Sequence, residues 1–431
     1  MNIFWFRRDL RLTDNTALYH ALKDGGLVIP VFIFDINILD DLEDRDDARV
    51  TFIHHTLIKI NEELREHGSA LHVYHGTPEK AFSEITSEFE IEKVFTNRDY
   101  EKYALERDSK ILQLLGSKGI AFHNYKDQVI FDRNEIMKDD GSPYVVFTPY
   151  SRKWKSELNK FDLEEYPMKK YLSNFYKCPP ENIPSLESIG FTKSKIAPPD
   201  NEVPDSLIKN YRRKRDFPGE DATSRLGIHL RFGTISIRKL VRHVRELSEV
   251  FLNELIWREF YQMVLYHFPQ IGRGEAFKKE YDRIEWRNNE NEFALWCAGK
   301  TGFPLVDAGM RQLNKTGFMH NRVRMVTASF LSKHLLIDWR WGEAYFARLL
   351  LDYDFASNNG GWQWSAGTGC DASPYFRIFN PAAQAKKFDP ELKYIRKWIP
   401  EIESFDYIKP IVEHKFARER CLNAYAKALR K

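Results

Sequence analysis

The first part of the chain contains short, continuous runs of apolar and β-branched residues. The runs are MNIFWF (1–6), LVIPVFIFD (27–35), ALHVYHG (70–76) and KVFTN (93–97). Strands of a parallel sheet are buried on both faces, so they read as continuous apolar runs and not as alternating patterns. The pattern therefore predicts an α/β fold with an open, parallel, Rossmann-like sheet.

Helical periodicity occupies the space between the second and third of these runs. Ile53, Leu57, Ile60 and Leu64 recur at intervals of three and four residues, and Gly68 follows as a stop signal. No GxGxxG sequence follows a predicted strand, so a dinucleotide-binding version of this fold has no support.

The pattern changes twice further along the chain. Periodicity is lost from about residue 132 to residue 204, where prolines are frequent, as in a connector between domains. Beyond it, long amphipathic stretches such as 254–268 and 344–356 predict an all-helical domain. We therefore predict an α/β domain at 1–131, a connector at 132–204 and an all-α domain at 205–431.

Composition narrows the class of protein. No apolar run approaches the roughly 20 residues of a membrane span, and charges directly follow MNIFWF, unlike a signal peptide. We expect a cytoplasmic monomer with no membrane partner. The four cysteines form no CxxC pair, so neither a disulfide framework nor a metal site is predicted. The net charge is only +3, but the basic segment 209–216 could meet phosphate.

Four segments of the helical half carry candidate chemistry: DATSRLG (221–227), NELIWREF (253–260), MHNRVRM (319–325) and LDYDFASNNGGWQW (351–364). Thr223 and Ser224 at a helix start can bind an anion or simply cap the helix. Glu254 and Trp257 share a helix face, where they can meet a ligand or serve an ion pair and the core.

The other two segments are equally ambiguous. Asn321 and Met325 lie one helical turn apart, with arginines that can face a ligand or solvent. Asp352 and Asp354 lack histidine at metal-ligand spacing, so pairing to arginine or binding a ligand is favoured. NNGGWQW fits neither a helix stripe nor a strand alternation and indicates a flat ligand. Because no nucleophile and base pair or metal cage is present, the chemistry must come from a cofactor.

With these segments in view, the sequence resembles the photolyase and cryptochrome family, and within it the microbial (class I) cyclobutane pyrimidine dimer photolyases. The resemblance rests on ordered motifs along nearly the whole chain: FWFRRDLRLTDNTAL, YRRKRDFPGEDATSRLGIHLRFGTIS, LNELIWREFY, GKTGFPLVDAGMRQL, MHNRVRMVTASFLSKHLLIDWR and NNGGWQWSAGTGCDASPYFRIFNP. It implies an α/β antenna domain, a helical domain that binds FAD, and light-driven splitting of a flipped-out pyrimidine dimer in DNA.

The resemblance also implies roles for individual residues. The lesion cavity would be formed by Glu254, Trp257, Asn321, Met325 and Trp364. FAD would be held by Tyr211, Thr223, Ser224, Arg225, Leu226, Gly227, Arg324, Asp352, Tyr353, Asp354 and Asn358, with Gly360 and Gly361 letting backbone pass close to it. Electron transfer would use Trp286, Trp339 and Trp362, and DNA contacts would come from Trp257, Arg258, Arg322 and Gln384.

Departures from the family pattern lie in the first half. Folate-binding relatives carry Asn-Glu where this chain has Tyr103 and Ala104, and Arg49 resembles a deazaflavin site only weakly, so a second antenna chromophore stays unidentified. A cryptochrome-type light sensor and a six-four photolyase are the alternatives. Asn358 argues against the plant-type sensor, which has Asp there, and Asn321 with Met325 argues against the histidine pair of six-four enzymes.

Overall fold

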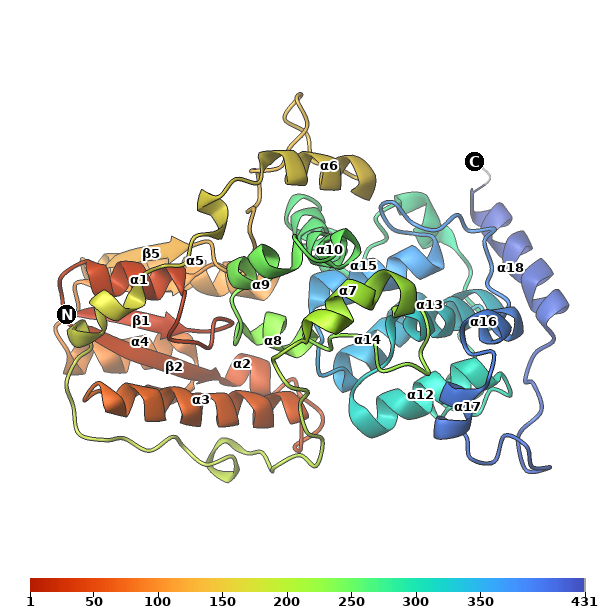
Figure 1. Cartoon of the computed structure of the whole chain (residues 1–431), viewed down its shortest axis with the longest axis horizontal. Coiled ribbons are helices and arrows are strands. Elements are labelled where there is room, and N and C mark those ends of the chain that lie inside the picture. The colour runs from red at the N-terminus through yellow and green to blue at the C-terminus, as the bar shows by residue number, and fades with distance from the viewer. Residues whose placement is uncertain (430–431) are drawn as a thin grey trace. The chain divides into compact units, whose positions relative to one another are not determined.

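The computed structural model describes residues 1–429, and these divide into two compact units (Figure 1). The sheet unit comprises residues 1–135, 156–202 and 226–246. The helical unit comprises residues 136–155, 203–225 and those from 247 onward. Segments of the two units thus alternate along the chain. The domain boundaries near residues 131 and 204 stay a prediction.

A five-stranded parallel sheet forms the centre of the sheet unit. Its strands are β1 (Asn2–Phe6), β2 (Val28–Asp35), β3 (His72–Gly76), β4 (Lys93–Asn97) and β5 (Ala121–Tyr125), in the order β3-β2-β1-β4-β5. The predicted parallel α/β fold and its four strands are confirmed. The fifth strand was not predicted, because β5 is a partly exposed edge strand without a continuous apolar run.

Helices cover both faces of this sheet. The helices of the sheet unit are α1 (Thr16–Lys23), α2 (Ile36–Leu39), α3 (Ala48–Glu66), α4 (Pro78–Glu88), α5 (Lys102–Ser117), α8 (Gly227–Phe232) and α9 (Ile237–Val244), of which α1, α3, α4 and α5 pack against the faces of the sheet. Phe32 and Phe34 of β2 pack in one core with α1 and α3, whereas Val31 and Ile33 pack in another with α4 and α5, because successive side chains point to opposite faces. The predicted helix around Leu57 is confirmed, and Gly68 follows it with φ +68°.

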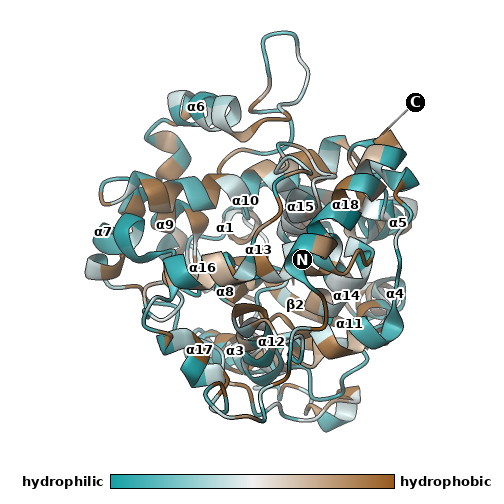
Figure 2. Cartoon of the chain, turned by 90° about the vertical axis from the view of Figure 1, so that its right-hand side faces the viewer, coloured by the Kyte–Doolittle hydropathy of each residue, from teal (hydrophilic) through white to brown (hydrophobic). Residues whose placement is uncertain are grey.

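The second half is helical, as predicted. Its helices include α7 (Asp205–Lys214), α10 (Glu249–His267), α11 (Glu290–Cys297), α12 (Pro304–Thr316), α13 (Asn321–Ser329), α14 (Trp339–Leu349), α15 (Phe355–Ala366), α16 (Pro381–Phe388), α17 (Lys393–Trp398) and α18 (His414–Leu429), and a further helix, α6 (Phe147–Glu157), lies in the predicted connector. Apolar and polar residues occur together along most of them (Figure 2). Among the described residues, no helix has the length and apolar character needed to cross a membrane.

Helix α15 contains the segment NNGGWQW, and the absence of a helix stripe in this segment is confirmed, although the segment is helical. The helix packs against α10, α13 and α14, and its apolar and polar residues are spread evenly around its axis. Since all of its residues are buried or partly buried, it shows no polar stripe that would reveal its period.

The amphipathic stretch 344–356 is divided between two helices. Helix α14 ends at Leu349, and α15 begins at Phe355 with Asp354 as its N-cap. The Asp354 carboxylate accepts the Ser357 N–H at 3.1 Å and its hydroxyl at 3.0 Å. The cap starts a new helix and leaves 350–354 as a loop.

Candidate functional site

A cavity of about 390 Å³ lies within the helical unit. Its lining includes Arg215, Glu254, Trp257, Arg258, Tyr261, Asn321, Arg324, Met325, Ala328, Phe346, Leu350, Asp352, Tyr353, Asp354, Ser357, Asn358, Gly361, Trp362, Trp364 and Ser365. All five residues predicted for the lesion cavity are in this set, together with five of those predicted to hold the cofactor. The residues come from α10, α13, the loop before α15 and α15 itself.

Glu254 and Trp257 project from the same face of α10, as their spacing predicts. The Glu254 carboxylate accepts a hydrogen bond from Arg215, the residue that caps the C-terminus of α7. Burial raises the pKa of Glu254, and the Arg215 guanidinium opposes that rise. Glu254 is thus a carboxyl whose protonation depends on what Arg215 contacts. Arg215 stood only in the basic segment 209–216 of the sequence, so its place in the cavity was missed.

Phe147 supports Trp257 from outside the cavity lining. The two rings are stacked with centroids 3.8 Å apart and planes 5° apart. The Phe147 N–H donates to Asp371 Oδ2 at 3.0 Å, and Phe260 packs edge-on against both rings. Phe147 lies in the segment that we interpreted as a connector, where no periodicity drew attention to it.

The loop 350–354 and α13 form the opposite wall of the cavity. Arg324 Nη2 donates to both carboxylate oxygens of Asp352, at 2.9 and 3.1 Å, so Asp352 takes the arginine-paired role that the sequence favoured. Asn321 and Met325, one turn apart on α13, both line the cavity.

Asn358 is held by an acid that the sequence did not point to. Its Nδ2 donates to the backbone oxygen of Glu343 at 3.1 Å and to the Glu343 carboxylate at 2.8 Å. With the amide nitrogen engaged, Oδ1 is the remaining acceptor of the side chain. Burial raises the pKa of Glu343, and its bond from Asn358 opposes the rise. Glu343 lies on α14, fifteen residues before Asn358, and no motif links the two.

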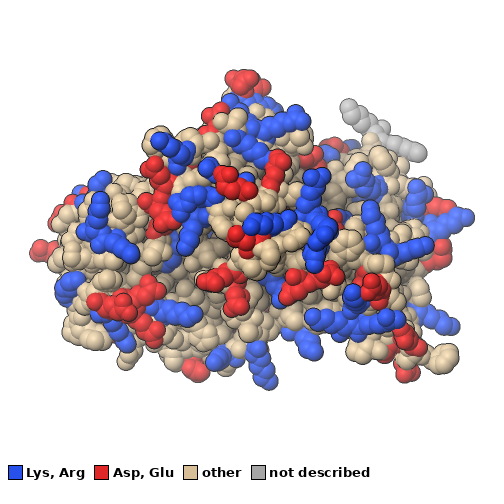
Figure 3. Space-filling view, viewed as in Figure 1, with Lys and Arg blue, Asp and Glu red and all other residues tan. Residues whose placement is uncertain are grey.

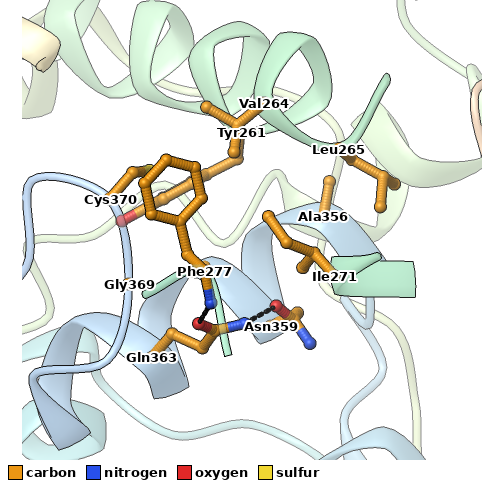
Figure 4. A pocket seen from close by; sticks show the side chains of 11 residues that line it. Tyr261, Val264, Leu265, Ile271, Phe277, Ala356, Asn359, Gln363, Gly369 and Cys370 are labelled. Carbon is orange, nitrogen blue, oxygen red and sulfur yellow. Dashed lines mark hydrogen bonds between the residues drawn. The ribbon is translucent and has the colours of Figure 1, made fainter. Parts of the chain in front are cut away.

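A second, smaller pocket lies between α10 and α15 (Figure 4). There Gln363 accepts the Phe277 N–H at 2.8 Å and donates to Asn359 at 2.9 Å. A Cβ on Gly360 would lie 2.3 Å from the Tyr261 ring, whereas one on Gly361 would meet nothing within 4 Å. The two adjacent glycines therefore differ. Gly360 makes room for Tyr261, and Gly361 leaves its side of α15 open.

The residues predicted to hold the cofactor phosphates and ribose lie outside the described lining of this cavity. Tyr211 packs against Phe251, with ring centroids 4.9 Å apart. Thr223 and Ser224 precede a helix that begins only at Gly227, with Leu226 at the N-cap and no side-chain cap, so the expected helix start at these hydroxyls was wrong. Arg225 has φ +51° and pairs with Asp221 at 2.7 Å. Leu226 and Gly227 belong to the sheet unit.

The three tryptophans predicted for electron transfer lie at different depths of the helical unit. Trp362 is buried and lines the cavity, and its ring neighbours are Phe346 at 5.0 Å and Trp296 at 6.1 Å. Trp339 is buried in the same core. Trp286 is half-buried and lies edge-on to Tyr425 at 6.0 Å. Trp296, which touches Trp362, was not singled out by any motif.

The predicted DNA contacts are divided between the cavity and the surface near it. Arg258 lines the cavity. Arg322 pairs with Asp216 at 2.8 Å and lies over the Phe388 ring, 4.4 Å from its centroid. The Gln384 Oε1 has no hydrogen-bond partner among the described residues. Helix α7 is largely hydrophilic and ends in Arg212, Arg213 and Lys214 (Figure 2). Positive and negative side chains are otherwise interspersed on the face shown in Figure 3.

The three residues that the sequence analysis compared with antenna sites, Tyr103, Ala104 and Arg49, make contacts within the chain or are buried. Tyr103 donates to Asp35 at the end of β2, and Ala104 is buried. Arg49 pairs with Asp47, the N-cap of α3, at 2.5 Å. The identity of a second chromophore stays open. Among the described residues, no three His, Cys, Asp or Glu side chains are arranged to hold a metal ion.

Several atoms of the cavity suit a flat, polar cofactor such as FAD. The buried Trp362 Nε1 has no hydrogen-bond partner among the described residues. Gly361 leaves open space beside α15. The ion pair of Asp352 with Arg324 and the amide of Asn358 place hydrogen-bond donors and acceptors in the cavity lining. Donors and acceptors set around an apolar cavity are typical of cofactor sites.

Comparisons with known proteins show the family to which the chain belongs. Residues 2–170 match the family described as DNA photolyase, and residues 251–406 match the FAD binding domain of DNA photolyase. A deoxyribodipyrimidine photo-lyase of Vibrio cholerae is 37% identical, over 99% of this chain and 100% of the relative. The crystal structure of a class III photolyase from Agrobacterium tumefaciens has a TM-score of 0.86 at 34% identity, over 99% of this chain and 97% of that one. The crystal structure of an archaeal photolyase from Sulfolobus tokodaii, solved with two FAD molecules, has a TM-score of 0.83 at 34% identity. The match covers 99% of this chain and 100% of that one.

Proposed function

The chain belongs to the DNA photolyase family, and on that premise we propose how its cavity repairs cyclobutane pyrimidine dimers in DNA by a light-driven reaction with FAD. One observation carries the proposal. Glu254, Trp257, Asn321, Met325 and Trp364, all assigned to the lesion, line the same cavity as Asp352 and Asn358, assigned to the cofactor. Lesion and cofactor can therefore share one cavity.

Bound FAD, when reduced and excited by light, supplies the electron that opens the dimer. The protein holds the dimer out of the DNA stack, and Trp257 and Trp364 offer aromatic surface for the extruded bases. Such stacking is worth about 1 to 3 kcal/mol per base in proteins that bind single strands. Glu254 lies beside Trp257 and can bond a dimer carbonyl, where negative charge develops during ring opening.

Arg215 determines which form of Glu254 meets the lesion. While Arg215 is paired with Glu254, the carboxylate accepts hydrogen bonds and donates none. An incoming phosphate can compete for Arg215, and burial then favours the protonated carboxyl, which can donate to the dimer. We therefore assign Arg215 as a positioning residue of the lesion site.

DNA binding draws on the cations near the cavity, Arg258, Arg322, Arg212, Arg213 and Lys214, with Gln384 beside them. Each phosphate neutralised steepens the loss of affinity with salt by about one unit of log-log slope. Action as a monomer and location in the cytoplasm stay predictions.

A separate proposal concerns electron transfer through Trp286, Trp339 and Trp362. Trp362 lines the cavity, Trp339 lies in the adjoining core and Trp286 is half-buried, an arrangement that supports electron transfer to the cofactor from outside. Replacing Trp286 or Trp362 with Phe is expected to block photoreduction of the oxidised protein and to leave repair by pre-reduced protein intact. Photoreduction at the parent rate in both variants would remove this assignment.

The decisive experiment offers the reduced protein two oligonucleotides under blue light, one with a cyclobutane dimer and one with a six-four photoproduct. We expect repair of the first only, and near-equimolar FAD released on heating. Repair of only the second would favour the six-four enzyme, and repair of neither, with FAD bound and reduced, would favour a light sensor.

A further inference from the structure

A cysteine, a histidine and a glutamate lie in line in the sheet unit. Cys178 Sγ is 3.9 Å from His72 Nε2, and His72 Nδ1 is 3.3 Å from Glu181 Oε1. The thiol and the carboxylate thus use opposite nitrogens of one imidazole ring. This order of nucleophile, base and orienting acid is the geometry of an activated thiol. It is not a metal site, because ligands on opposite sides of the ring cannot converge on one ion.

Backbone hydrogen bonds fix these three side chains. His72 is the first residue of β3, a strand at the edge of the sheet. The Cys178 N–H donates to Gly68 O at 3.2 Å, next to the start of β3. The Glu181 carbonyl oxygen accepts from Asn61 Nδ2 of α3 at 2.8 Å. Backbone hydrogen bonds therefore hold both ends of the segment 178–181, which carries the thiol and the carboxylate, against the residues around α3 and β3.

The three groups differ in exposure as an activated thiol requires. His72 is buried, with Phe89 packed edge-on against its ring at 5.9 Å. The Glu181 side chain is 46% exposed, and Cys178 is partly exposed. A small reagent can reach the sulfur while the imidazole stays shielded. Burial raises the pKa of the Cys178 thiol, so the resting thiol is protonated and reacts only with help from a base.

The remaining cysteines have different surroundings. Cys370 and Cys421 are buried, and burial raises the pKa of each thiol to about 12. Cys297 is partly exposed like Cys178, and burial raises its thiol pKa to about 12. Cys297 is therefore the comparison for Cys178, since it is the other partly exposed cysteine and has no imidazole among its described hydrogen-bond partners.

We propose that Cys178 is a reactive thiol that forms mixed disulfides with small disulfides, with His72 as its general base and Glu181 as the group that orients His72. The Cys178 sulfur attacks one sulfur of the incoming disulfide while its proton passes to His72 Nε2. The sulfur–sulfur bond of the reagent breaks, the new bond joins Cys178 to one half, and the other half leaves as a thiolate that takes the proton from His72. No further oxidant is needed.

The test treats the FAD-loaded full chain with dithiodipyridine, a neutral disulfide whose released half is coloured. Peptide mass spectrometry identifies the modified cysteine at early times. We expect Cys178 to react first, and the fast phase of colour release to vanish in Cys178→Ser and persist in Cys297→Ser. A Cys178 that reacts no faster than Cys297 would overturn the proposal.

Two further variants separate base assistance from mere access. His72→Gln should slow the Cys178 reaction at least about tenfold, as expected for loss of a general base, and Glu181→Gln should slow it less. Because His72 is buried and its replacement can disturb the sheet edge, the half-exposed Glu181 provides the second test. Parent rates in both variants would show that Cys178 is only accessible and not activated. Dimer repair should be unchanged in Glu181→Gln.

Discussion

At the scale of single residues, the ion pair between Arg215 and Glu254 is the contact most open to experiment. Glu254→Ala removes the hydrogen bond to the dimer, whereas Glu254→Gln keeps a neutral donor like that of the protonated carboxyl and loses the ion pair with Arg215. Hydrogen bonds to charged groups are worth about 1.5 to 3 kcal/mol. We therefore expect Ala to lower the number of dimers repaired per absorbed photon several-fold and Gln to lower it less, with smaller effects on DNA affinity in both.

The measurement is repair yield at saturating dimer-containing DNA, with binding measured separately in the dark. Arg215→Lys serves as the partner variant, because a lysine keeps the charge and loses the planar fork of donors. Equal yields in Glu254→Ala and the parent protein would rule out Glu254 as the group that stabilises the opening dimer.

Phe147 tests whether the stack behind Trp257 matters for recognition. Aromatic pairs contribute about 0.5 to 1.5 kcal/mol beyond area burial, so Phe147→Ala should weaken dimer binding about 2- to 10-fold. Phe147 lies outside the cavity lining and acts through Trp257. Undamaged DNA has no extruded base to place against Trp257, so it should bind as before. Phe147→Tyr should restore affinity, and Val146→Ala, at an exposed neighbouring position, is the control. Loss of affinity for both kinds of DNA would indicate a general structural defect instead.

At the scale of elements, the residues of the site could be predicted from sequence, but their supports could not. Glu254 and Trp257, and likewise Asn321 and Met325, are close in the chain, so helical spacing and family motifs placed them together. Arg215 and Glu343 reach the site from other helices, and nothing in a linear pattern shows which helices will be neighbours. The motifs of α15 were found, but its helical structure was not, because a helix without exposed residues shows no polar stripe.

The two central glycines of α15 give a matched pair of substitutions. Gly360→Ala would place a methyl group 2.3 Å from the Tyr261 ring. Overpacking of this kind costs about 1 to 3 kcal/mol, so the melting temperature should fall. Gly361→Ala meets no atom within 4 Å and gains helix propensity of up to about 1 kcal/mol, so the FAD-free protein should be slightly stabilised.

The two variants should also differ in cofactor content. The added methyl of Gly361→Ala enters the cavity lining, so FAD occupancy after purification should fall although stability does not. Thermal unfolding with and without FAD, together with flavin absorbance, checks both effects. Equal loss of stability in the two variants would contradict the assignment of Gly360 to packing and Gly361 to open space.

At the scale of the whole molecule, each compact unit is assembled from segments that are separated in the sequence. Residues 136–155 belong to the helical unit, although they directly follow the sheet segment, and residues 226–246 belong to the sheet unit. The loss of periodicity between about residues 132 and 204 indicated a change of domain. It could not show which unit each segment joins, because that depends on long-range packing and not on local period.

Two buried histidines of the helical unit and the buried Asp9 of the sheet unit make opposite contributions to stability in acid. In the helical unit, burial lowers the pKa of His334 to about 3, with His414, Arg420 and Lys333 adding repulsion, and lowers that of His320 to about 4. In the sheet unit, burial raises the pKa of Asp9 to about 6, so the folded unit takes up a proton there more readily than its unfolded chain. Acid therefore weakens the helical unit at these histidines, whereas at Asp9 it favours the folded sheet unit.

The two buried histidines determine the direction in which pH changes the stability of the helical unit through these side chains. An unfolded chain protonates histidine near pH 6.5, whereas the folded unit keeps both rings neutral until about pH 4. The contribution of these two histidines to stability is full above about pH 6.5 and is lost as pH drops toward 4, with a slope approaching about 1.4 kcal/mol per pH unit for each histidine. Nine of the ten tryptophans lie in the helical unit, so tryptophan fluorescence during urea unfolding reports this slope.

His334→Phe should reduce the slope by about half, and His75→Gln, at an exposed position of β3, should leave it unchanged. A parent slope retained in His334→Phe would show that its burial does not control acid unfolding.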